Sequence, residues 1–214
     1  MKELIVKKIK TTFYEDRGTF INFMKPVEWN IIDTVNWKKY DYSPNVQFRI
    51  AYCDTAIFLH YKVHESSIRA KTIVDNGEVW KDSCIEFFVM PENDGIYYNF
   101  EFNCVGACRL AAGTGRNDRE MVPVEVVSQI FRNSSLCNKQ LIEEQKIHEP
   151  WDMVIGIPYS CFFKHPDYSP TGKTIHANFY KCGDELEKPH FLSWNPINTE
   201  KPDFHRPEFF GTLT

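Results

Sequence analysis

The sequence predicts an all-β protein, an antiparallel β-sandwich of jelly-roll type with few short helical turns. Apolar and polar residues alternate in short runs, as in strands that bury one face of a sheet. Turn-forming Gly, Pro, Asn and Asp residues separate these runs. No window of about 15 residues keeps a helical period without Gly or Pro, so the helices that a parallel α/β sheet needs between its strands are missing.

Length and composition describe one globular domain. The chain has 214 residues, of which 43% are hydrophobic and 25% charged, a balance typical of a protein with a sizeable core. No linker composition, low-complexity tract or internal repeat divides it. We therefore expect a single domain over residues 1–214, in which residues 1–26 form an N-terminal segment that leads into the sandwich along a sheet edge.

Two hairpins are the clearest local predictions. Residues 46–52 and 57–63 alternate on either side of a short turn, and each run has one apolar face. Residues 84–90 and 96–104 repeat this arrangement around a loop that contains Pro91. Shorter runs predict strands at residues 108–112, 122–127, 141–146, 153–157 and 175–180, a helical turn at 158–163 and a last strand within 205–213.

Charge and hydropathy exclude two classes of partner. Lys and Arg number 25 against 29 Asp and Glu, which gives a net charge of −4. A nucleic-acid-binding protein usually carries a basic excess, so that function is not expected. No apolar stretch reaches the ~18 residues of a membrane span, and the first residues lack the apolar core of a signal peptide. The sequence is that of a cytoplasmic protein, or of an extracellular or periplasmic one if a leader has been removed.

Cysteine and histidine spacing does not predict a metal site. The chain has seven cysteines: Cys53, Cys84, Cys104, Cys108, Cys137, Cys161 and Cys182. The count is odd, which favours a reducing compartment, and the spacing lacks the paired pattern of a zinc site. His60 and His64 are the one close histidine pair, and on a strand they lie about 13 Å apart, too far for one ion.

Four motifs in order resemble carbohydrate-binding module family 9 and its wider family-9-like (DOMON-like) relatives. They are VWKDSCIEFFV at 79–89, WDMVIGIP at 151–158, SWNP at 193–196 and HRPEFFGTL at 205–213. The resemblance covers about residues 27–214. It implies a β-sandwich that binds an oligosaccharide or polysaccharide without acting on it, as an accessory to a glycoside hydrolase.

The resemblance also implies which residues bind the ligand. Family members hold a sugar ring between two tryptophans, which match Trp80 and Trp194. The carboxylate that binds the sugar hydroxyls matches Glu86, and Arg109 is the basic residue nearest to the family's arginine. Relatives bind structural calcium, for which residues 92–94 (Glu92, Asn93 and Asp94) are the one ligand cluster that we find, and the ion is left unassigned.

These residue types suit sugar recognition. An indole ring covers the apolar C–H face of a pyranose, while a carboxylate accepts hydrogen bonds from neighbouring hydroxyls. Strand parity supports a binding face: if Phe87 and Phe100 face the core, then Glu86 and Glu101 share the opposite face of the sheet. That face is expected to be polar.

Other functions stay open. Glu86 and Glu101, on paired strands, offer the carboxylate pair of a glycoside hydrolase, although no nucleophile motif such as G-x-S-x-G is present. Whether the chain is an enzyme is therefore undecided, with binding alone favoured. The wider fold group also includes haem-binding domains, for which Met90, Met121 or Met153 would supply an axial ligand. A protein-interaction module is the third alternative.

Overall fold

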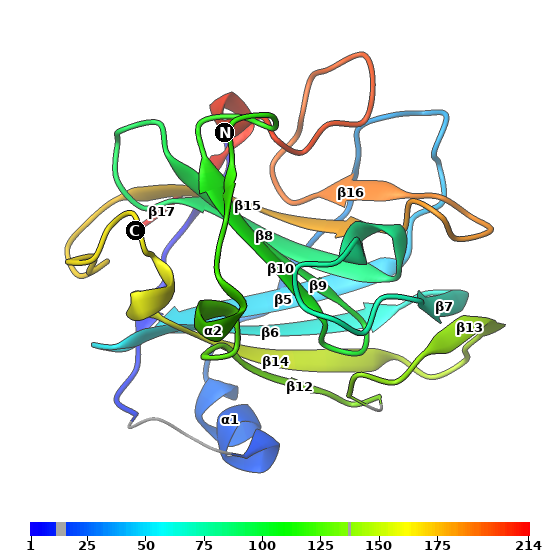
Figure 1. Cartoon of the computed structure of the whole chain (residues 1–214), viewed down its shortest axis with the longest axis horizontal. Helices are drawn as coiled ribbons and strands as arrows, with labels where there is room; N and C mark the ends of the chain where they lie inside the picture. Colours follow the sequence, from blue (N-terminus) through cyan, green and yellow to red (C-terminus); the bar gives the residue numbers. More distant parts are fainter. Residues whose placement is uncertain (12–15, 137) are drawn as a thin grey trace.

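The computed structural model describes residues 1–11, 16–136 and 138–214. Residues 12–15 of the predicted N-terminal segment and Cys137 lie outside this part. Two largely antiparallel sheets pack face to face, joined at one end by a short two-stranded ribbon (Figure 1). The predicted all-β sandwich with few short helices is therefore confirmed. No helix in the described part has the length and apolarity needed to cross a membrane.

The larger sheet carries the candidate site. Its spatial order is β1 (Glu3–Leu4), β17 (Gly211–Leu213), β15 (Ile175–Cys182), β8 (Cys84–Met90), β9 (Tyr97–Asn103), β10 (Cys108–Gly113) and β11 (Glu120–Met121). Beside this path, β16 (Phe191–Ser193) pairs with β15, and β4 (Thr34–Val35) pairs with β16.

The smaller sheet forms the second layer. Its order is β12 (Phe131–Ser134), β14 (Trp151–Pro158), β6 (Ala56–His64), β5 (Asn45–Tyr52) and β2 (Lys7–Lys8), with β3 (Asn30–Ile31) also paired with β5. The ribbon consists of β7 (Ser67–Ala70) and β13 (Ile142–Lys146). The two predicted hairpins are β5–β6 and β8–β9, so the alternation located both of them.

The helices are short and lie outside the sandwich or in its connections. They are α1 (Arg17–Met24), α2 (Val124–Val127) and the 3₁₀ turns η1 (Val79–Lys81), η2 (Tyr159–Cys161) and η3 (Pro207–Phe209). The Asp16 carboxylate caps α1 by accepting a hydrogen bond from the Thr19 N–H at 2.9 Å. Phe20 and Met24 then pack against the outer face of the smaller sheet, and Figure 1 shows α1 on that side.

Aromatic side chains from both sheets fill the space between them. The Phe48 ring of β5 stacks on the Phe179 ring of β15, with centroids 3.9 Å apart. Phe87 of β8 continues the stack at 5.1 Å from Phe179. Phe100 of β9 lies in the same core. Because Phe87 and Phe100 face inwards, the alternation of the strands turns Glu86 and Glu101 to the outer face.

A second apolar cluster covers part of that outer face. Phe88 and Tyr180 project outwards from β8 and β15, and the C-terminal segment crosses over them. The Phe204 ring stacks on the Tyr180 ring at 4.1 Å, with an interplanar angle of 6°. The outer face of the larger sheet is therefore roofed by chain rather than open to solvent, which makes a pocket there possible.

The strand predicted at residues 122–127 is wrong. Val122 and Pro123 lie in the connection after β11, and Val124–Val127 form α2, because Pro123, with φ −54°, directly precedes this helical turn. Proline is favoured beside the first turn of a helix and cannot donate in a sheet ladder. Val127 is buried in the main core, so the run of valines that suggested a strand instead packs one face of a helical turn.

The N-terminal segment reaches the edges of both sheets. β1 pairs in parallel with β17 of the larger sheet, with Glu3 opposite Thr212. β2 pairs in parallel with β5 of the smaller sheet, with Lys7 opposite Ala51. The sequence predicted contact with one edge. The observed pairing caps two edges that would otherwise expose unpaired N–H and C=O groups.

A buried ion pair lies within the sandwich near the β7–β13 end. The Lys181 ammonium is 2.9 Å from the Glu65 carboxylate, and both side chains are fully buried. Lys181 also donates to His190 Nε2 at 2.8 Å, and the Trp151 indole N–H donates to the second Glu65 oxygen at 2.8 Å. Each charge therefore has several partners, as buried ions require.

Replacing Lys181 should destabilise the fold strongly. Lys181→Met leaves the Glu65 carboxylate buried without a cation, which should lower the free energy of unfolding by about 3–5 kcal/mol. Denaturant unfolding measures the change. Lys164→Met is the control, because it removes a surface pair with the exposed Glu120 carboxylate and should leave stability nearly unchanged. Equal effects of the two substitutions would contradict this interpretation.

Candidate functional site

A row of paired residues crosses four strands on the outer face of the larger sheet. Tyr180 of β15 lies opposite Glu86 of β8, and Glu86 lies opposite Glu101 of β9. Glu101 in turn lies opposite Arg109 of β10. Directly opposed residues on antiparallel strands hold their Cβ atoms within about 5.5 Å. The fold therefore brings together Glu86 and Arg109, two of the four predicted binding residues, with Glu101 between them.

A pocket of about 340 Å³ opens above this row. Its walls come from strands β8, β9 and β10, from the loop between β10 and β11, and from the C-terminal segment. Its lining residues combine aromatic rings with charged groups of both signs: Tyr40, Trp80, Glu86, Glu101, Arg109, Arg116, Arg119, Cys182, Asp184, Phe191, Pro202, Asp203, Phe204 and His205. This is the composition expected where a ligand has both apolar faces and hydrogen-bonding groups.

Trp80 supplies a half-buried aromatic wall. It sits in the 3₁₀ turn η1, immediately before β8. The Arg109 guanidinium lies over its ring, 4.8 Å from the centroid, and Arg109 Nη1 donates to the Asn76 carbonyl at 3.1 Å. The stacked arginine and the strand that follows fix the indole at the pocket, where part of its surface stays available.

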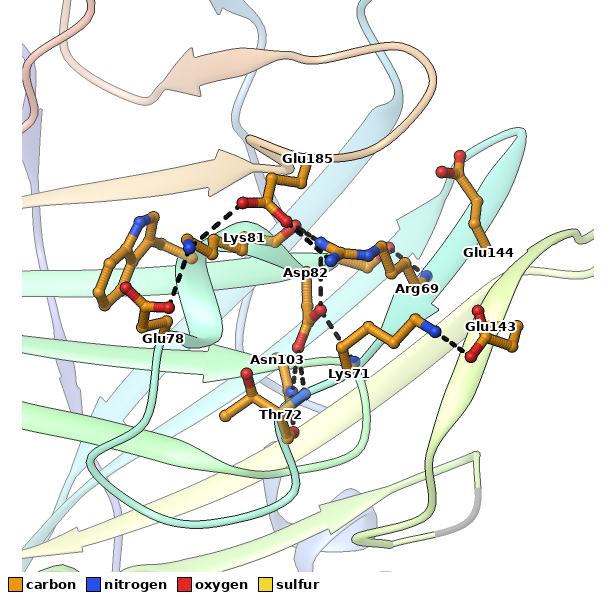
Figure 2. Close-up of polar contacts among 12 residues, drawn as sticks. Arg69, Lys71, Thr72, Glu78, Lys81, Asp82, Asn103, Glu143, Glu144 and Glu185 are labelled. Carbon is orange, nitrogen blue, oxygen red and sulfur yellow. Dashed lines mark hydrogen bonds and ion pairs between the residues drawn. The ribbon is translucent and has the colours of Figure 1, made fainter.

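Asp82 anchors the turn that carries Trp80. Its fully buried carboxylate accepts hydrogen bonds from the Lys71 and Thr72 N–H groups at 2.9 and 3.0 Å. Asn103 Nδ2 donates to it at 2.9 Å, and the Arg69 guanidinium lies 3.5 Å away. Figure 2 shows these groups converging on Asp82. The preceding loop is therefore tied to β9 beneath the pocket.

A second set of contacts joins η1 to the loop after β15. The Asp184 N–H donates to the Trp80 carbonyl at 3.2 Å, and the Glu185 N–H donates to the Lys81 carbonyl at 3.2 Å. The Glu185 carboxylate pairs with Arg69 at 2.8 Å and with Lys81 at 3.2 Å (Figure 2). Hydrogen bonds and ion pairs therefore hold the turn with Trp80 and the loop with Asp184 together at the pocket.

The carboxyl groups on the pocket floor are nearly inaccessible to bulk water. Glu86 is 2% exposed and Glu101 is 4% exposed. The Cys182 thiol donates to Glu86 Oε1 at 3.0 Å, and Asn99 Nδ2 donates to Glu101 Oε1 at 2.7 Å. These few contacts leave acceptor capacity on both carboxyl groups, since each oxygen has two lone pairs.

Burial controls the protonation of these acids. It raises the pKa of Glu101 to about 7, against the opposing effect of Arg119, and raises the pKa of Asp184 to about 6. Burial, and then the neighbouring Glu101 carboxylate, hold the pKa of Glu86 well above its usual range. Such displaced pKa values in a pocket are typical of functional sites.

Arg119 carries a donor without a partner. Its Nη1 is buried and meets no hydrogen-bond acceptor among the described residues, and the nearest carboxylate oxygen, Glu101 Oε1, is 3.9 Å away. Arg116, in contrast, is paired with Asp203 at 2.7 Å. A ligand hydroxyl both accepts and donates hydrogen bonds. It can therefore accept from the unused Arg119 donor and donate to the buried acid beside it.

Trp194 does not belong to this pocket, so the predicted tryptophan pair is wrong. Trp194 is 4% exposed and lies between the sheets, 5.6 Å from the Phe179 ring and 6.3 Å from the Phe48 ring. A Cβ on Gly211 would lie 2.3 Å from its Cζ3 atom. The backbone bond from Trp194 N–H to the Phe179 carbonyl fixes this inward orientation.

Two other aromatic residues line the pocket together with Trp80. Tyr40 and Phe191 are half-buried, line the pocket and meet edge to face at 4.9 Å. Tyr40 precedes β5 by several residues, whereas Phe191 begins β16. Sequence reasoning missed both, together with Arg119 and Asp184. Loops bring Tyr40, Arg119 and Asp184 to the pocket, and the three-residue strand of Phe191 is too short to show a period.

The carboxylates of the loop proposed for calcium already have side-chain partners. Asp94 pairs with His165 Nε2 at 3.0 Å and accepts from the Ile96 N–H at 3.0 Å. Glu92 pairs with Lys173. Calcium requires 6–8 convergent oxygen ligands, and two carboxylates that are bonded to different side chains, Lys173 and His165, do not fit that requirement.

Comparison with known proteins identifies the class. The sequence profile of carbohydrate-binding family 9 matches residues 19–214, so the chain belongs to that family. A crystal structure from Bacteroides uniformis ATCC 8492, of a protein provisionally described as carbohydrate-binding, is 47% identical. The alignment covers 99% of this chain and 98% of that chain, with a TM-score of 0.94.

Two more distant structures share the fold. Both are family 9 carbohydrate-binding modules from Caldicellulosiruptor kristjanssonii, one in complex with glucose and one with cellotriose. Each is 12% identical to this chain, and each alignment covers 99% of this chain. The glucose complex is covered to 94% with a TM-score of 0.65, and the cellotriose complex to 92% with a TM-score of 0.63. A search of curated proteins gives no match.

Removing the Asp82 carboxylate should loosen the turn that carries Trp80. Asp82→Ala leaves the Lys71 and Thr72 N–H groups without their acceptor and removes the carboxylate beside Arg69, so the free energy of unfolding should fall by about 3 kcal/mol or more. Chemical denaturation measures it. Glu78→Ala, in the same segment but exposed, is the matched control and should have little effect. An unchanged free energy of unfolding in Asp82→Ala would show that the Asp82 hydrogen bonds do not stabilise the fold.

The raised pKa of Glu101 makes stability depend on pH. The folded protein retains the Glu101 proton up to about pH 7, whereas the ordinary pKa is 4.5. The folded state therefore binds more protons in this window, and the contribution to stability present below pH 4.5 is lost as the pH rises through 7. Relative to Glu101→Gln, the wild-type protein should lose stability between these values in pH-dependent urea unfolding. If the stability of the two proteins changed with pH in the same way, the raised pKa of Glu101 would be contradicted.

Proposed function

We propose that this protein binds carbohydrate in the pocket above β8–β10 and does not cleave it. A pyranose ring lies on the free face of Trp80, and its hydroxyls bond to Glu101, Glu86 and Arg119. The indole buries the apolar C–H face of the ring, while the carboxyl groups and the guanidinium exchange hydrogen bonds with its polar rim.

One observation carries this proposal: a half-buried indole stands beside a buried donor and buried acceptors with unused hydrogen-bonding capacity. Arg119 Nη1 lacks a partner among the described residues, and Glu101 lies 3.9 Å from it. Buried polar atoms are normally satisfied, because an unmade hydrogen bond costs about 1–3 kcal/mol. A ligand rich in hydroxyls supplies the missing partners at the point where the apolar wall ends.

Family membership supports a sugar as that ligand. Two structures with the same fold contain glucose and cellotriose, so glucose and short glucose oligomers are the first ligands to test. Tyr40 and Phe191 take the role that the sequence assigned to Trp194, and they provide the other aromatic surface of the pocket. A pocket of about 340 Å³ matches the lower end of the range for small-molecule sites, roughly 300–1,000 Å³.

The arrangement of the two glutamates favours binding over hydrolysis. Glu86 and Glu101 project side by side from neighbouring strands of one sheet, so both reach a ligand from below. Glycosidases place their two carboxyl groups on either side of the scissile bond. Incubation with aryl glycosides tests this distinction, and turnover that Glu86→Gln abolishes would show an enzyme.

The biological role that follows is accessory to glycan breakdown. A binding protein with one ring-sized pocket is expected to have a Kd between about 1 μM and 1 mM, or roughly −8 to −4 kcal/mol. Affinity of this order suits a protein that holds an oligosaccharide or polysaccharide near a glycoside hydrolase and releases it readily.

Replacing Trp80 tests the proposal directly. Trp80→Ala removes the apolar wall and should weaken binding of glucose or cellotriose at least about tenfold, which corresponds to 1.4 kcal/mol. Isothermal titration calorimetry on the wild-type protein and the variant measures the change. Circular dichroism verifies that the variant is folded.

Trp29 provides the matched control. It is 37% exposed and lies over Arg49 of the smaller sheet, outside the pocket. Trp29→Ala should leave the affinity unchanged. Equal affinity of Trp80→Ala and wild type, or a loss confined to Trp29→Ala, would overturn the assignment of the pocket.

A further inference from the structure

Two cysteines face each other beside the floor of the pocket, and one of them, Cys182, lines it. Cys84 of β8 and Cys182 of β15 are directly opposed across the strand pair. Glu86 follows two residues after Cys84 on the same strand, so the three side chains share the outer face. One ligand atom from each of Cys84, Cys182 and Glu86 lies within 4.8 Å of the others, and the Cys182 sulfur is 3.0 Å from Glu86 Oε1.

This donor set suits a zinc-class ion. Two thiolates and a carboxylate are ligands that zinc uses, at about 2.3 Å for sulfur and 2.0–2.2 Å for oxygen. Around one tetrahedral ion these atoms stand about 3.7 Å apart. The present separations lie between 3.0 and 4.8 Å, so the side chains need only small shifts. Thiolates favour zinc and softer ions over calcium or magnesium.

We propose that Cys84, Cys182 and Glu86 form a binding site for a zinc-class divalent cation, with the fourth coordination position facing the pocket. Cys182 and Glu86 line that pocket, so a water or a ligand oxygen can occupy the open position. Three protein ligands with one open position is the arrangement of many zinc sites that bind a further molecule. The site goes beyond the proposed sugar binding and does not depend on it.

Metal binding at this site displaces protons from buried groups. Burial raises the pKa of the Cys84 thiol to about 12 and holds the pKa of the Cys182 thiol well above its usual range, so both thiols are protonated before the ion arrives. Binding breaks two S–H bonds and forms two metal–sulfur bonds and one metal–oxygen bond, and it releases to the buffer the two thiol protons and any proton that Glu86 holds. No electron is transferred, and no oxidant is needed.

Cadmium titration of the reduced protein tests the site. Cd²⁺ is a soft probe whose bonds to thiolates give a charge-transfer absorption, which reports sulfur coordination without any sugar present. We expect one equivalent of Cd²⁺ to bind with this band, and Zn²⁺ to displace it. Cadmium-113 NMR of the wild-type protein should show coordination by two sulfurs, a readout that needs no variant.

Variants assign the ligands. Cys84→Ser and Cys182→Ser should each lose the strong binding, with affinity lower at least about 100-fold, whereas Glu86→Gln should weaken it and retain the band. Cys161→Ser is the control, because that buried cysteine lies beside α2, with its sulfur 3.7 Å from the Val126 carbonyl. Circular dichroism verifies folding of each variant.

Several results would overturn the proposal. They are the absence of a thiolate band in the reduced wild-type protein, a cadmium signal with fewer than two sulfur ligands, or a band that persists in both cysteine variants. A disulfide between Cys84 and Cys182 that reductants do not open would also overturn it. None of these results alters the sugar-binding prediction, which calorimetry on the metal-free protein tests separately.

Discussion

The burial of Glu86 and Glu101 on the outer face of the larger sheet is the constraint on which the site depends. Inward-facing Phe87 and Phe100 require these acids to face outwards, yet the C-terminal segment covers that face. Carboxyl groups out of reach of water are costly unless they are protonated or bonded. Burial raises the pKa of Glu101 to about 7, so ionising this group in the folded protein is energetically unfavourable. A ligand with hydroxyl groups relieves this cost, and the pocket is open to such a ligand.

The aromatic wall depends on a separate set of polar contacts. Trp80 lies on a short turn that Asp82 helps to hold, because the Asp82 carboxylate joins the preceding loop to β9. Glu185 fastens the same turn to the loop after β15. The two halves of the pocket are thus held in different ways. Strand register positions the polar half, and buried hydrogen bonds position the apolar half. Their relative position is fixed before a ligand arrives, which lowers the entropic cost of binding.

Strand alternation made much of the fold predictable. The β5–β6 and β8–β9 hairpins, and the outward direction of Glu86, follow from period-2 patterns. Trp194 was misassigned because a tryptophan near a motif looks the same in sequence whether it lines a pocket or fills a core, and its contact with Gly211 is a tertiary fact. Tyr40 and Arg119 reach the pocket through loop paths that no local pattern encodes. Strand register therefore made Glu86 and Glu101 predictable, and the resemblance to family 9 made Trp80 predictable, whereas Tyr40 and Arg119 carried neither signal.

A crystal structure of the protein with glucose or cellotriose tests the central claim most directly. The account predicts one pyranose ring stacked on the free face of Trp80, with hydroxyls within hydrogen-bond distance of the Glu101 carboxylate and Arg119 Nη1. A sugar bound on another surface, or one in the pocket that leaves the Arg119 donor and the Trp80 face untouched, would contradict it.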